Sequence, residues 1–354
     1  MSRFTAVYRV HADAETIEAR ARAIAVEQSV EMPLEAIDDA SILEDIVGKV
    51  EAIEDRGGGM FDVRIALATA TVGDDAGQLL NMVFGNTSLH EDVALVDVAV
   101  PAAFSGPHHG IDGLRHRVGA FGRALTCSAL KPQGLPPARL AVMAERFARG
   151  GIDFIKDDHG LADQAYSPFA ERVAAIAKAV GPTRYVPSLS GDLDRLRRQI
   201  DIARSHGIDT VLIAPMIVGW TTFQTLTREN TDIAFFAHPT MGGAARIAPE
   251  LLIGKLFRAL GADAVIFPNH GGRFGYTAEA CGRLAELALA PWNDVRPSMP
   301  VPAGGMTLER VPEMLDFYGP DAMLLIGGSL LAARERLTEA TAEFTRAVAQ
   351  HTYR

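Results

Sequence analysis

The stretch Gly150-Gly151-Ile152-Asp153-Phe154-Ile155-Lys156-Asp157-Asp158-His159 joins a helix end, a short strand and a group of titratable side chains. In the preceding segment, 139–149, apolar side chains recur at positions i, i+3, i+4 and i+7, which is the spacing of one helix face. The two glycines then end that helix, and the apolar run 152–155 predicts a buried strand. Lys156 continues this strand, so we expect its side chain to point into the structure.

The same order of strand, loop and helix recurs at intervals of about thirty residues towards the C-terminus. Eight parallel strands with helical crossovers form a (β/α)8 or TIM barrel. A doubly wound open sheet is the main alternative, but it needs a Gly-rich phosphate turn after its first strand, and Ala129-Leu130-Lys131-Pro132-Gln133-Gly134 is not such a turn. The predicted strands are 124–130, 152–155, 184–188, 210–214, 233–237, 264–267, 300–302 and 322–326.

The N-terminal part has a different order of elements, with strands that are not each followed by a helix. This order is typical of an α+β domain. We therefore expect a ferredoxin-like α+β domain over 1–115 and the barrel, with its catalytic mouth, over 116–354. The predicted N-terminal elements are a strand over 3–10, a helix over 13–28, and strands over 62–71 and 93–100.

Composition excludes several classes of protein. The formal net charge is -10 and no run of basic residues occurs, so we expect no nucleic-acid partner. Two isolated cysteines, Cys127 and Cys281, are too few for a disulfide framework and favour a reducing, cytoplasmic location. Because no apolar run reaches the length of a membrane span, we expect no membrane association.

The active site of a barrel forms at the C-terminal ends of its strands, so the residues that end each predicted strand are the candidate site residues. Paired glycines follow the last two strands, where barrels commonly bind phosphate through backbone N–H groups, although tight turns alone would also explain them. The candidates are Lys131 after the first strand, Lys156, Asp158 and His159 at the second, His238 after the fifth, Arg273 after the sixth, and Gly304, Gly305, Gly327 and Gly328 after the last two.

Lys156, Asp158 and His159 lie within four residues, which is compatible with a metal site. A lysine ammonium repels a cation, so either no metal binds or Lys156 is chemically altered. Solvated loop charges explain this cluster equally well. His238 follows a wholly apolar strand and is either a satisfied polar group or a catalyst.

Four motifs, in order, resemble the large subunit of ribulose-bisphosphate carboxylase and its RuBisCO-like (form IV) relatives, over most of the chain. The family's fold, an N-terminal α+β domain followed by a (β/α)8 barrel, agrees with the pattern above. The motifs are Phe104-Ser105-Gly106-Pro107-His108-His109-Gly110-Ile111, Gly122-Arg123, Leu130-Lys131-Pro132-Gln133-Gly134-Leu135, and the run from Gly150 to Asp158.

The resemblance implies that Lys156 is carbamylated by carbon dioxide, which would turn a cation into an anionic oxygen ligand for Mg²⁺. Asp158 matches a family metal ligand, and His159 stands where the carboxylases have a glutamate. Because imidazole suits softer metals, another divalent ion is an alternative. Lys131 matches a lysine that handles protons, and His238 matches a histidine of the family's active site.

Other positions depart from the carboxylases. Gln133 replaces a second lysine, Pro239 replaces a phosphate-binding arginine, and Ala303 replaces a serine before the first glycine pair. Met32-Pro33 replaces a threonine-tryptophan pair. The resemblance implies that these replacements remove one of the two phosphate-binding sites and the groups that orient carbon dioxide. We therefore expect no carboxylation.

Further family positions suggest the assembly and the phosphate contacts. Glu27 and Asn81 match residues that reach a partner subunit's barrel, which implies a homodimer with shared active sites. Arg273 lies near the place of the carboxylase's mobile-loop lysine, and the glycine pairs align with the family's phosphate loops.

The residues that remain suit proton abstraction next to a carbonyl, with a phosphate held nearby. We therefore expect an enolising enzyme that acts on a singly phosphorylated ketose or keto sugar acid. An isomerase of the 5-methylthioribulose 1-phosphate type is the leading hypothesis. The alternatives are a decarboxylase or carbon–carbon hydrolase of a 3-oxo-isoapionate 4-phosphate type substrate, and a metabolite-binding protein without catalysis.

Overall fold

The computed structural model describes residues 2–292 and 294–353, which form two compact units. One unit comprises the residues up to Ser105 together with Met241–Leu252, and the other comprises Gly106–Thr240 and the residues from Ile253 onward. Among the helices of the described residues, none has both the length and the apolar character needed to cross a bilayer.

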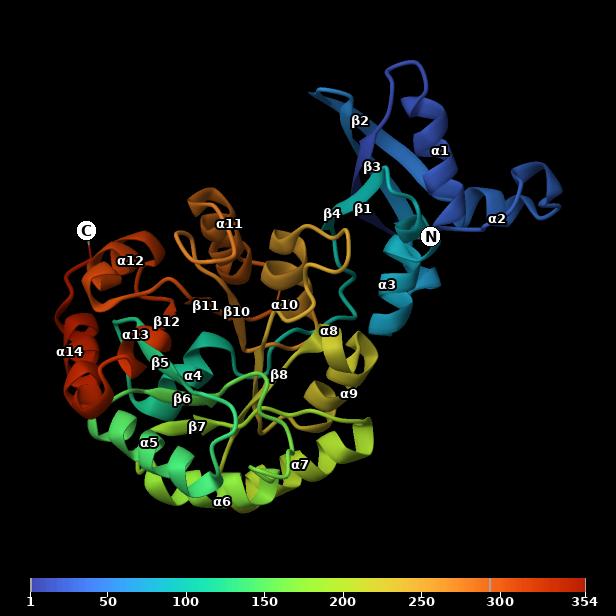
Figure 1. The fold of residues 1–354 in the computed structure, drawn as a ribbon. Helices are drawn as coiled ribbons and strands as arrows, with labels where there is room; N and C mark the ends of the chain where they lie inside the picture. Colours follow the sequence, from blue (N-terminus) through green and yellow to red (C-terminus); the bar gives the residue numbers. More distant parts are fainter. Residues whose placement is uncertain (1, 293, 354) are drawn as a thin grey trace. The chain divides into compact units, whose positions relative to one another are not determined.

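The first unit is an antiparallel sheet, in the order β2-β3-β1-β4, with α1 against it (Figure 1). Along β1 every second side chain is buried, as expected for a strand with one face on a core. Segment Met241–Leu252 belongs to this unit, because Leu95 in β4 pairs with Ile247. The elements are β1 (Arg3–His11), α1 (Ile17–Glu27), α2 (Ala40–Asp45), β2 (Lys49–Gly57), β3 (Met60–Ala68), α3 (Ala76–Phe84) and β4 (Val93–Val98), with 3₁₀ turns at Leu34–Ala36, Thr69–Thr71 and Asn86–Leu89.

The sequence pattern misses one strand of this sheet. It predicts the strands at 3–10, 62–71 and 93–100, but the described residues contain a further strand, β2. This strand lies at the sheet edge, pairs only with β3, and is mostly exposed. Its sequence is accordingly charged and lacks the alternation of a half-buried strand, so no periodic signal identifies it.

The second unit is a parallel barrel in which the eight predicted strands are all present, in the order β7-β6-β5-β12-β11-β10-β9-β8. A parallel bridge between Ser188 and Leu212 links the two ends of this order, beyond β7 and at β8. The doubly wound alternative is therefore wrong and the (β/α)8 fold is confirmed. The strands are β5 (Leu125–Leu130), β6 (Phe154–Asp157), β7 (Arg184–Val186), β8 (Thr210–Ile213), β9 (Ala234–Ala237), β10 (Ala264–Pro268), β11 (Met299–Ala303) and β12 (Met323–Leu325).

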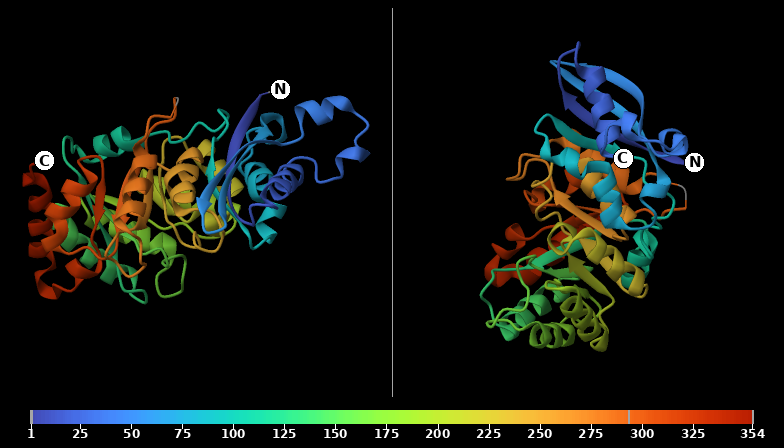
Figure 2. Two further views of the ribbon diagram at one scale, coloured as in Figure 1. Left: turned by 90° about the horizontal axis from the view of Figure 1, so that it is seen from above. Right: turned by 90° about the vertical axis from the view of Figure 1, so that its right-hand side faces the viewer.

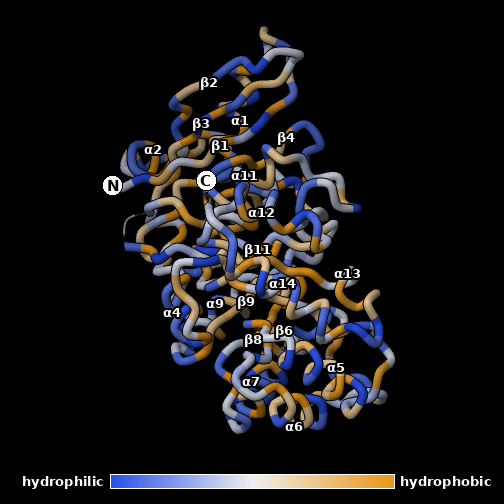
Figure 3. The backbone as a smooth tube through the Cα atoms, turned by 90° about the vertical axis from the view of Figure 1, so that its left-hand side faces the viewer, coloured by the Kyte–Doolittle hydropathy of each residue, from blue (hydrophilic) through white to orange (hydrophobic). Residues whose placement is uncertain are grey.

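Helices of this unit surround the strands, as the views in Figures 1 and 2 show. The tube in Figure 3 is mainly apolar along the barrel strands, whereas α5 and α6 alternate between apolar and polar residues. This pattern reflects strands that are buried on both faces and helices that bury one stripe. The helices are α4 (Gly110–Val118), α5 (Pro137–Arg149), α6 (Phe169–Ala179), α7 (Leu193–Ser205), α8 (Pro215–Val218), α9 (Trp220–Glu229), α10 (Phe257–Ala259), α11 (Ala278–Leu289), α12 (Val311–Tyr318), α13 (Gly328–Leu331) and α14 (Leu337–Gln350), with a π-helical segment at Glu250–Leu256 and 3₁₀ turns at Leu308–Arg310 and Arg334–Arg336.

Helix α4 lies across the N-terminal end of the barrel. Asp263, just before β10, accepts the backbone N–H groups of His109 and Gly110 at 2.8 and 2.7 Å. Arg115 donates to carbonyl oxygens just before β5 and β12. With this end closed, the opposite mouth is where strand-end side chains can meet a ligand. The apolar cluster inside the barrel includes Ile111 and Leu114 of α4 with Leu125, Phe154, Phe236, Ile266, Val301 and Met323.

We expect Asp263→Asn to destabilise the barrel by about 1–3 kcal/mol, because one carboxylate oxygen would become an N–H₂ donor facing backbone N–H groups. Asp263 is 1% exposed and also accepts the N–H of Phe235 at 2.9 Å, so no water can replace the lost acceptor. The urea midpoint measures the change. Asp201→Asn, on an exposed part of α7, is the control and should change little. Equal midpoints for the two variants would contradict this role of Asp263.

Candidate active site

Buried Asp157 fixes the end of β6. Its carboxylate accepts hydrogen bonds from Arg172 Nε at 3.1 Å, the Tyr185 hydroxyl at 2.8 Å and the backbone N–H of Ser188 at 3.0 Å. The side chains of Asp157 and Arg172 are both 0% exposed. Burial raises the pKa of the Tyr185 phenol well above its usual range, which keeps this hydroxyl a donor. A buried carboxylate with three donors is held in one geometry.

The Arg172 guanidinium extends this anchor to the loop that follows β6. It donates to the carbonyl oxygens of Ala162 at 2.8 Å and Ser167 at 2.7 Å. Because side chains alternate along a strand, Lys156 and Asp158 lie on the opposite side from Asp157. The network around Asp157 therefore positions the two candidate site residues next to it.

Asp158 contacts two of the other predicted site residues. Its Oδ1 lies 3.0 Å from Lys131 Nζ and 3.2 Å from His159 Nδ1. Burial alone would raise the pKa of the Asp158 carboxyl, but hydrogen bonds from His159 and Lys131 hold it below its usual range. The residues that follow β5 and β6 thus form an ion pair between Lys131 and Asp158. The Lys131 side chain in this pair is 39% exposed.

Lys156 lies within β6, as its sequence position predicts, and is 3% exposed. Its Nζ donates to the carbonyl oxygen of Asp157 at 2.9 Å. Burial lowers the pKa of the Lys156 amine, with the charge of Lys131 adding to the effect, although the thiol of Cys127 and the carboxylate of Asp158 oppose it. A lowered pKa favours the neutral amine, the form that can react with carbon dioxide.

The donor set around Asp158 fits a divalent cation if Lys156 carries a carbamate. The described residues contain no cluster of three or more His, Cys, Asp or Glu side chains placed to hold a metal ion. Asp158 and His159 offer two ligand side chains, and a carbamate on Lys156 would be a third. A carbamate would supply oxygen and would also remove the repulsion between an ammonium and the cation.

His159 and His238 form a stacked pair, with ring centroids 4.4 Å apart and planes 11° from parallel. His238 Nδ1 lies 2.5 Å from Thr240 Oγ1, and the Thr240 backbone N–H also points to this nitrogen at 3.2 Å. Burial, with Lys156 and His159 nearby, lowers the pKa of His238 to about 2. His238 is therefore a neutral imidazole held in place by Thr240.

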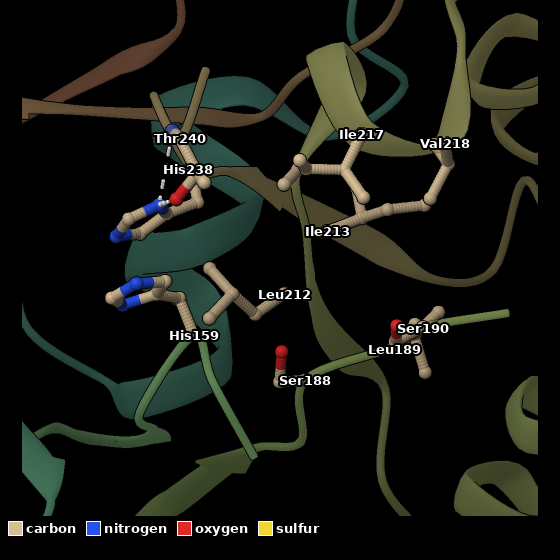
Figure 4. Close-up of a pocket in the computed structure, with 11 residues that line it drawn as sticks. His159, Ser188, Leu189, Ser190, Leu212, Ile213, Ile217, Val218, His238 and Thr240 are labelled. Carbon is tan, nitrogen blue, oxygen red and sulfur yellow. Dashed lines mark hydrogen bonds between the residues drawn. The ribbon is translucent and has the colours of Figure 1, made fainter. Parts of the chain in front are cut away.

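A pocket of about 50 Å³ opens beside this histidine pair (Figure 4). The two rings lie one above the other at one side, and Ile213, Ile217 and Val218 lie across the opening. Its lining comes from the carboxyl ends of β6, β7, β8 and β9 and from α8. The pocket is thus part of the barrel mouth and continues directly from the predicted catalytic residues.

The four predicted phosphate-binding glycines lie after β11 and β12. At Gly304, Gly327 and Gly328 an added Cβ would meet no atom within 4 Å, so internal packing does not require glycine there. Gly304 has a φ of +83°, which explains its identity. Gly305 differs, because a Cβ would lie 2.6 Å from Gly272 Cα; close packing of two loops suffices to explain it.

Arg310 reaches the first glycine pair, whereas Arg273 contacts Phe274 in the described part of the chain. Arg310 Nη1 donates to the carbonyl oxygens of Gly305 at 2.9 Å and His270 at 3.2 Å. Arg273 is exposed, and its guanidinium lies over the ring of Phe274, 4.8 Å from the centroid. Arg310 therefore joins the loops after β10 and β11 through hydrogen bonds to their backbone carbonyl oxygens.

Glu27 and Asn81 lie near each other in the first unit. Asn86 donates to the Glu27 carboxylate at 2.9 Å, and Gln28 donates to the carbonyl oxygen of Asn81 at 3.2 Å. Glu27 is half-buried and Asn81 is exposed. The end of α1 is thus linked by hydrogen bonds to α3 and to the turn that follows it.

The sequence pattern did not identify Asp157, Arg172, Tyr185, Thr240 or Arg310 as site residues. For Asp157 the available signal was a second acidic residue inside a strand that is otherwise buried. For Thr240 it was a hydroxyl two residues after a strand-end histidine. Neither signal distinguishes a supporting residue from an ordinary loop residue.

Comparison with known proteins agrees with this geometry. Residues 110–251 match the family model for the ribulose bisphosphate carboxylase large chain, catalytic domain. The chain is 62% identical to a 5-methylthioribulose-1-phosphate isomerase of Rhodospirillum rubrum over 98% of its own length and 96% of that protein. It is 54% identical to ribulose bisphosphate carboxylase-like protein 1 of Rhodopseudomonas palustris, over 99% and 98% of the two chains.

The crystal structure of a Rubisco-like protein from Rhodopseudomonas palustris has the same fold. It superposes with a TM-score of 0.93 at 51% identity, covering 100% of this chain and 99% of the other. The matches span both the antiparallel sheet and the barrel. The chain therefore belongs to the ribulose bisphosphate carboxylase large-chain family, among its RuBisCO-like proteins.

Proposed function

We propose that the protein is an enolising isomerase that acts on 5-methylthioribulose 1-phosphate and does not fix carbon dioxide. The observation that carries this proposal is the contact between Lys131 Nζ and Asp158 Oδ1, 3.0 Å, in a barrel mouth shared with a neutral His238. The similarity to an isomerase over nearly the whole chain supports the same substrate. Isomerisation needs a proton to leave a carbon next to a carbonyl and to return elsewhere.

In the proposed mechanism Lys131 moves this proton. Its side chain is partly exposed at the mouth, while Asp158 orients the amine. His238, uncharged and fixed by Thr240, is placed to hydrogen-bond a substrate oxygen as negative charge develops on it. The glycine loops after β11 and β12 would hold the phosphate through backbone N–H groups.

Lys156 as a carbamate, Asp158 and His159 would hold Mg²⁺ or another divalent ion. When bound, such an ion supplies positive charge that stabilises an enediolate. The remaining work falls to the protein's own groups. Asp157 and Arg172 keep the end of β6 in place, and the buried surroundings of Lys156 favour the neutral amine that carbamylation needs.

We do not expect carboxylation of ribulose bisphosphate, because Pro239 cannot supply a cationic side chain to bind the second phosphate of that substrate. Pro239 stands next to His238 where the carboxylases have an arginine. Burying a doubly charged phosphate without a partner is strongly unfavourable. This argues for a substrate with one phosphate, and the decarboxylase or hydrolase alternative has no separate observation in its favour.

We also propose that the active unit is a homodimer. The family resemblance suggests that Glu27 and Asn81 of a second copy complete each site. In closed twofold dimers each copy gives and receives the same contacts, so the two sites would be equivalent.

The function is tested by incubating the protein with 5-methylthioribulose 1-phosphate in deuterated buffer. We expect deuterium at the carbon that receives the proton, formation of an isomeric ketose phosphate, and no product from ribulose 1,5-bisphosphate with labelled carbon dioxide. Lys131→Met should slow exchange by at least ~100-fold, because general acid–base groups contribute about this much or more. Nuclear magnetic resonance follows both exchange and product.

Lys178→Met, on α6 outside the barrel, is the matched control and should exchange like the unmodified protein. If Lys131→Met retains exchange, Lys131 is not the group that moves the proton. If the unmodified protein exchanges neither this compound nor a 3-oxo-isoapionate 4-phosphate, with metal and bicarbonate present, the enolisation proposal is wrong.

Mg²⁺ binding should depend on bicarbonate and on Lys156. Calorimetric titration is expected to give tighter Mg²⁺ binding with bicarbonate present, and Lys156→Met should remove this difference. His159→Ala should weaken binding by at least ~10-fold, whereas His159→Glu should restore it, because a carboxylate is the harder ligand. Identical titrations for all variants would exclude the carbamate and the imidazole as ligands.

Shared sites would allow two inactive variants to complement each other. Glu27→Gln and Lys131→Met should each be inactive alone, but equal co-expression should recover about one quarter of the activity, because half the dimers would contain one intact site. Differently tagged subunits allow the mixed dimer to be isolated and assayed. An inactive mixed dimer would show that Glu27 and Lys131 do not serve one site in trans.

A further inference from the structure

The pocket beside His159 and His238 is apolar on the sides that face away from the histidines. Its apolar lining residues are Leu189, Leu212, Ile213, Ala214, Ile217 and Val218. Of the eleven described residues that line it, none is Lys, Arg, Asp or Glu. Besides the two histidines, the polar lining residues are Ser188, Ser190 and Thr240, whose hydroxyls carry no charge. Such a lining suits an uncharged apolar group.

The strand order places this pocket across the mouth from the glycine loops. Around the ring, β5 and β6 lie between β12 on one side and β7 on the other. Gly304 and Gly327 follow β11 and β12, whereas the pocket is built mainly from the ends of β7, β8 and β9. Lys131 and Asp158, which follow β5 and β6, therefore lie between the glycine loops and the pocket along one side of the mouth.

The size of the pocket limits what can occupy it. Its volume is about 50 Å³. By the same kind of measure one water needs about 10–15 Å³, so a group of a few heavy atoms fits. A second phosphate would be both large and without a cation, whereas a short thioether or alkyl group would gain from leaving water.

We propose that this pocket binds the apolar end of a singly phosphorylated ketose, the methylthio group of 5-methylthioribulose 1-phosphate, a specificity site that rests on the function proposed above. The phosphate lies at the glycine loops, the carbon that loses its proton lies near Lys131, and the methylthio group lies against Leu212 and Ile217. The pocket thus selects substrates by the chemical group at the end of the carbon chain that is opposite the phosphate.

The test compares 5-methylthioribulose 1-phosphate with ribulose 1-phosphate, in which a hydroxyl replaces the methylthio group. We expect kcat/KM to favour the methylthio compound by ~10–100-fold, as for small groups in apolar pockets. Ile217→Ser should lower this preference by about 5-fold, mainly through the methylthio compound. Ile217 is 55% exposed, so this change does not threaten folding.

Val142→Ser is the matched control, since Val142 is also 55% exposed but lies on α5 outside the mouth. It should leave the preference unchanged. Equal kcat/KM values for the two compounds, unaffected by Ile217→Ser, would overturn the pocket assignment while leaving the proposed isomerase function standing.

A binding measurement separates the two proposals. In a Lys131→Met background, where turnover is blocked, calorimetry gives the dissociation constants of both compounds directly. A preference for the methylthio compound that Ile217→Ser reduces supports the pocket even if the unmodified protein turns over neither compound, a result that would count against the function alone. Equal dissociation constants in both backgrounds would reject the pocket.

Discussion

The buried ion pair between Asp157 and Arg172 is the contact on which the site depends. Two opposite charges without solvent are stable only when hydrogen bonds satisfy both, and here Tyr185, Ser188 and the loop carbonyls do so. Removing one partner would leave the other charge buried and unpaired. The pair thereby couples the end of β6 to β7 and α6, and it makes the positions of Lys156 and Asp158 a property of the barrel core.

This rigid support matters because the charges at the mouth are unbalanced. Lys131 and Lys156 both lie near the Asp158 carboxylate, and of the two amines only Lys131 has a substantially exposed side chain. Burial lowers the pKa of the Lys156 amine. A carbamate on Lys156 would reverse the local charge and would be a second anionic ligand beside Asp158.

Much of this arrangement follows from the sequence, because barrel strands are short apolar runs and their ends converge on one mouth. Lys131, Lys156, Asp158, His159 and His238 come together as that rule requires. The rest depends on tertiary contacts without a local pattern. Exposed β2 lacks alternation, consecutive Asp157 and Asp158 are equivalent in sequence but face opposite sides, and only the folded loops distinguish Arg310 from Arg273.

The residue after His238 is Pro239, which carries no charge, and this agrees with the proposed substrate with one phosphate. Pro239 offers no charge beside His238, and the neighbouring surface of Leu212, Ile213 and Ile217 is apolar. Apolar surface in place of a phosphate-binding side chain changes which terminal group of the substrate is bound. It does not move Lys131 or Asp158. Because these residues lie directly after β5 and β6, the proton-transfer chemistry can persist while the group bound at β7–β9 changes.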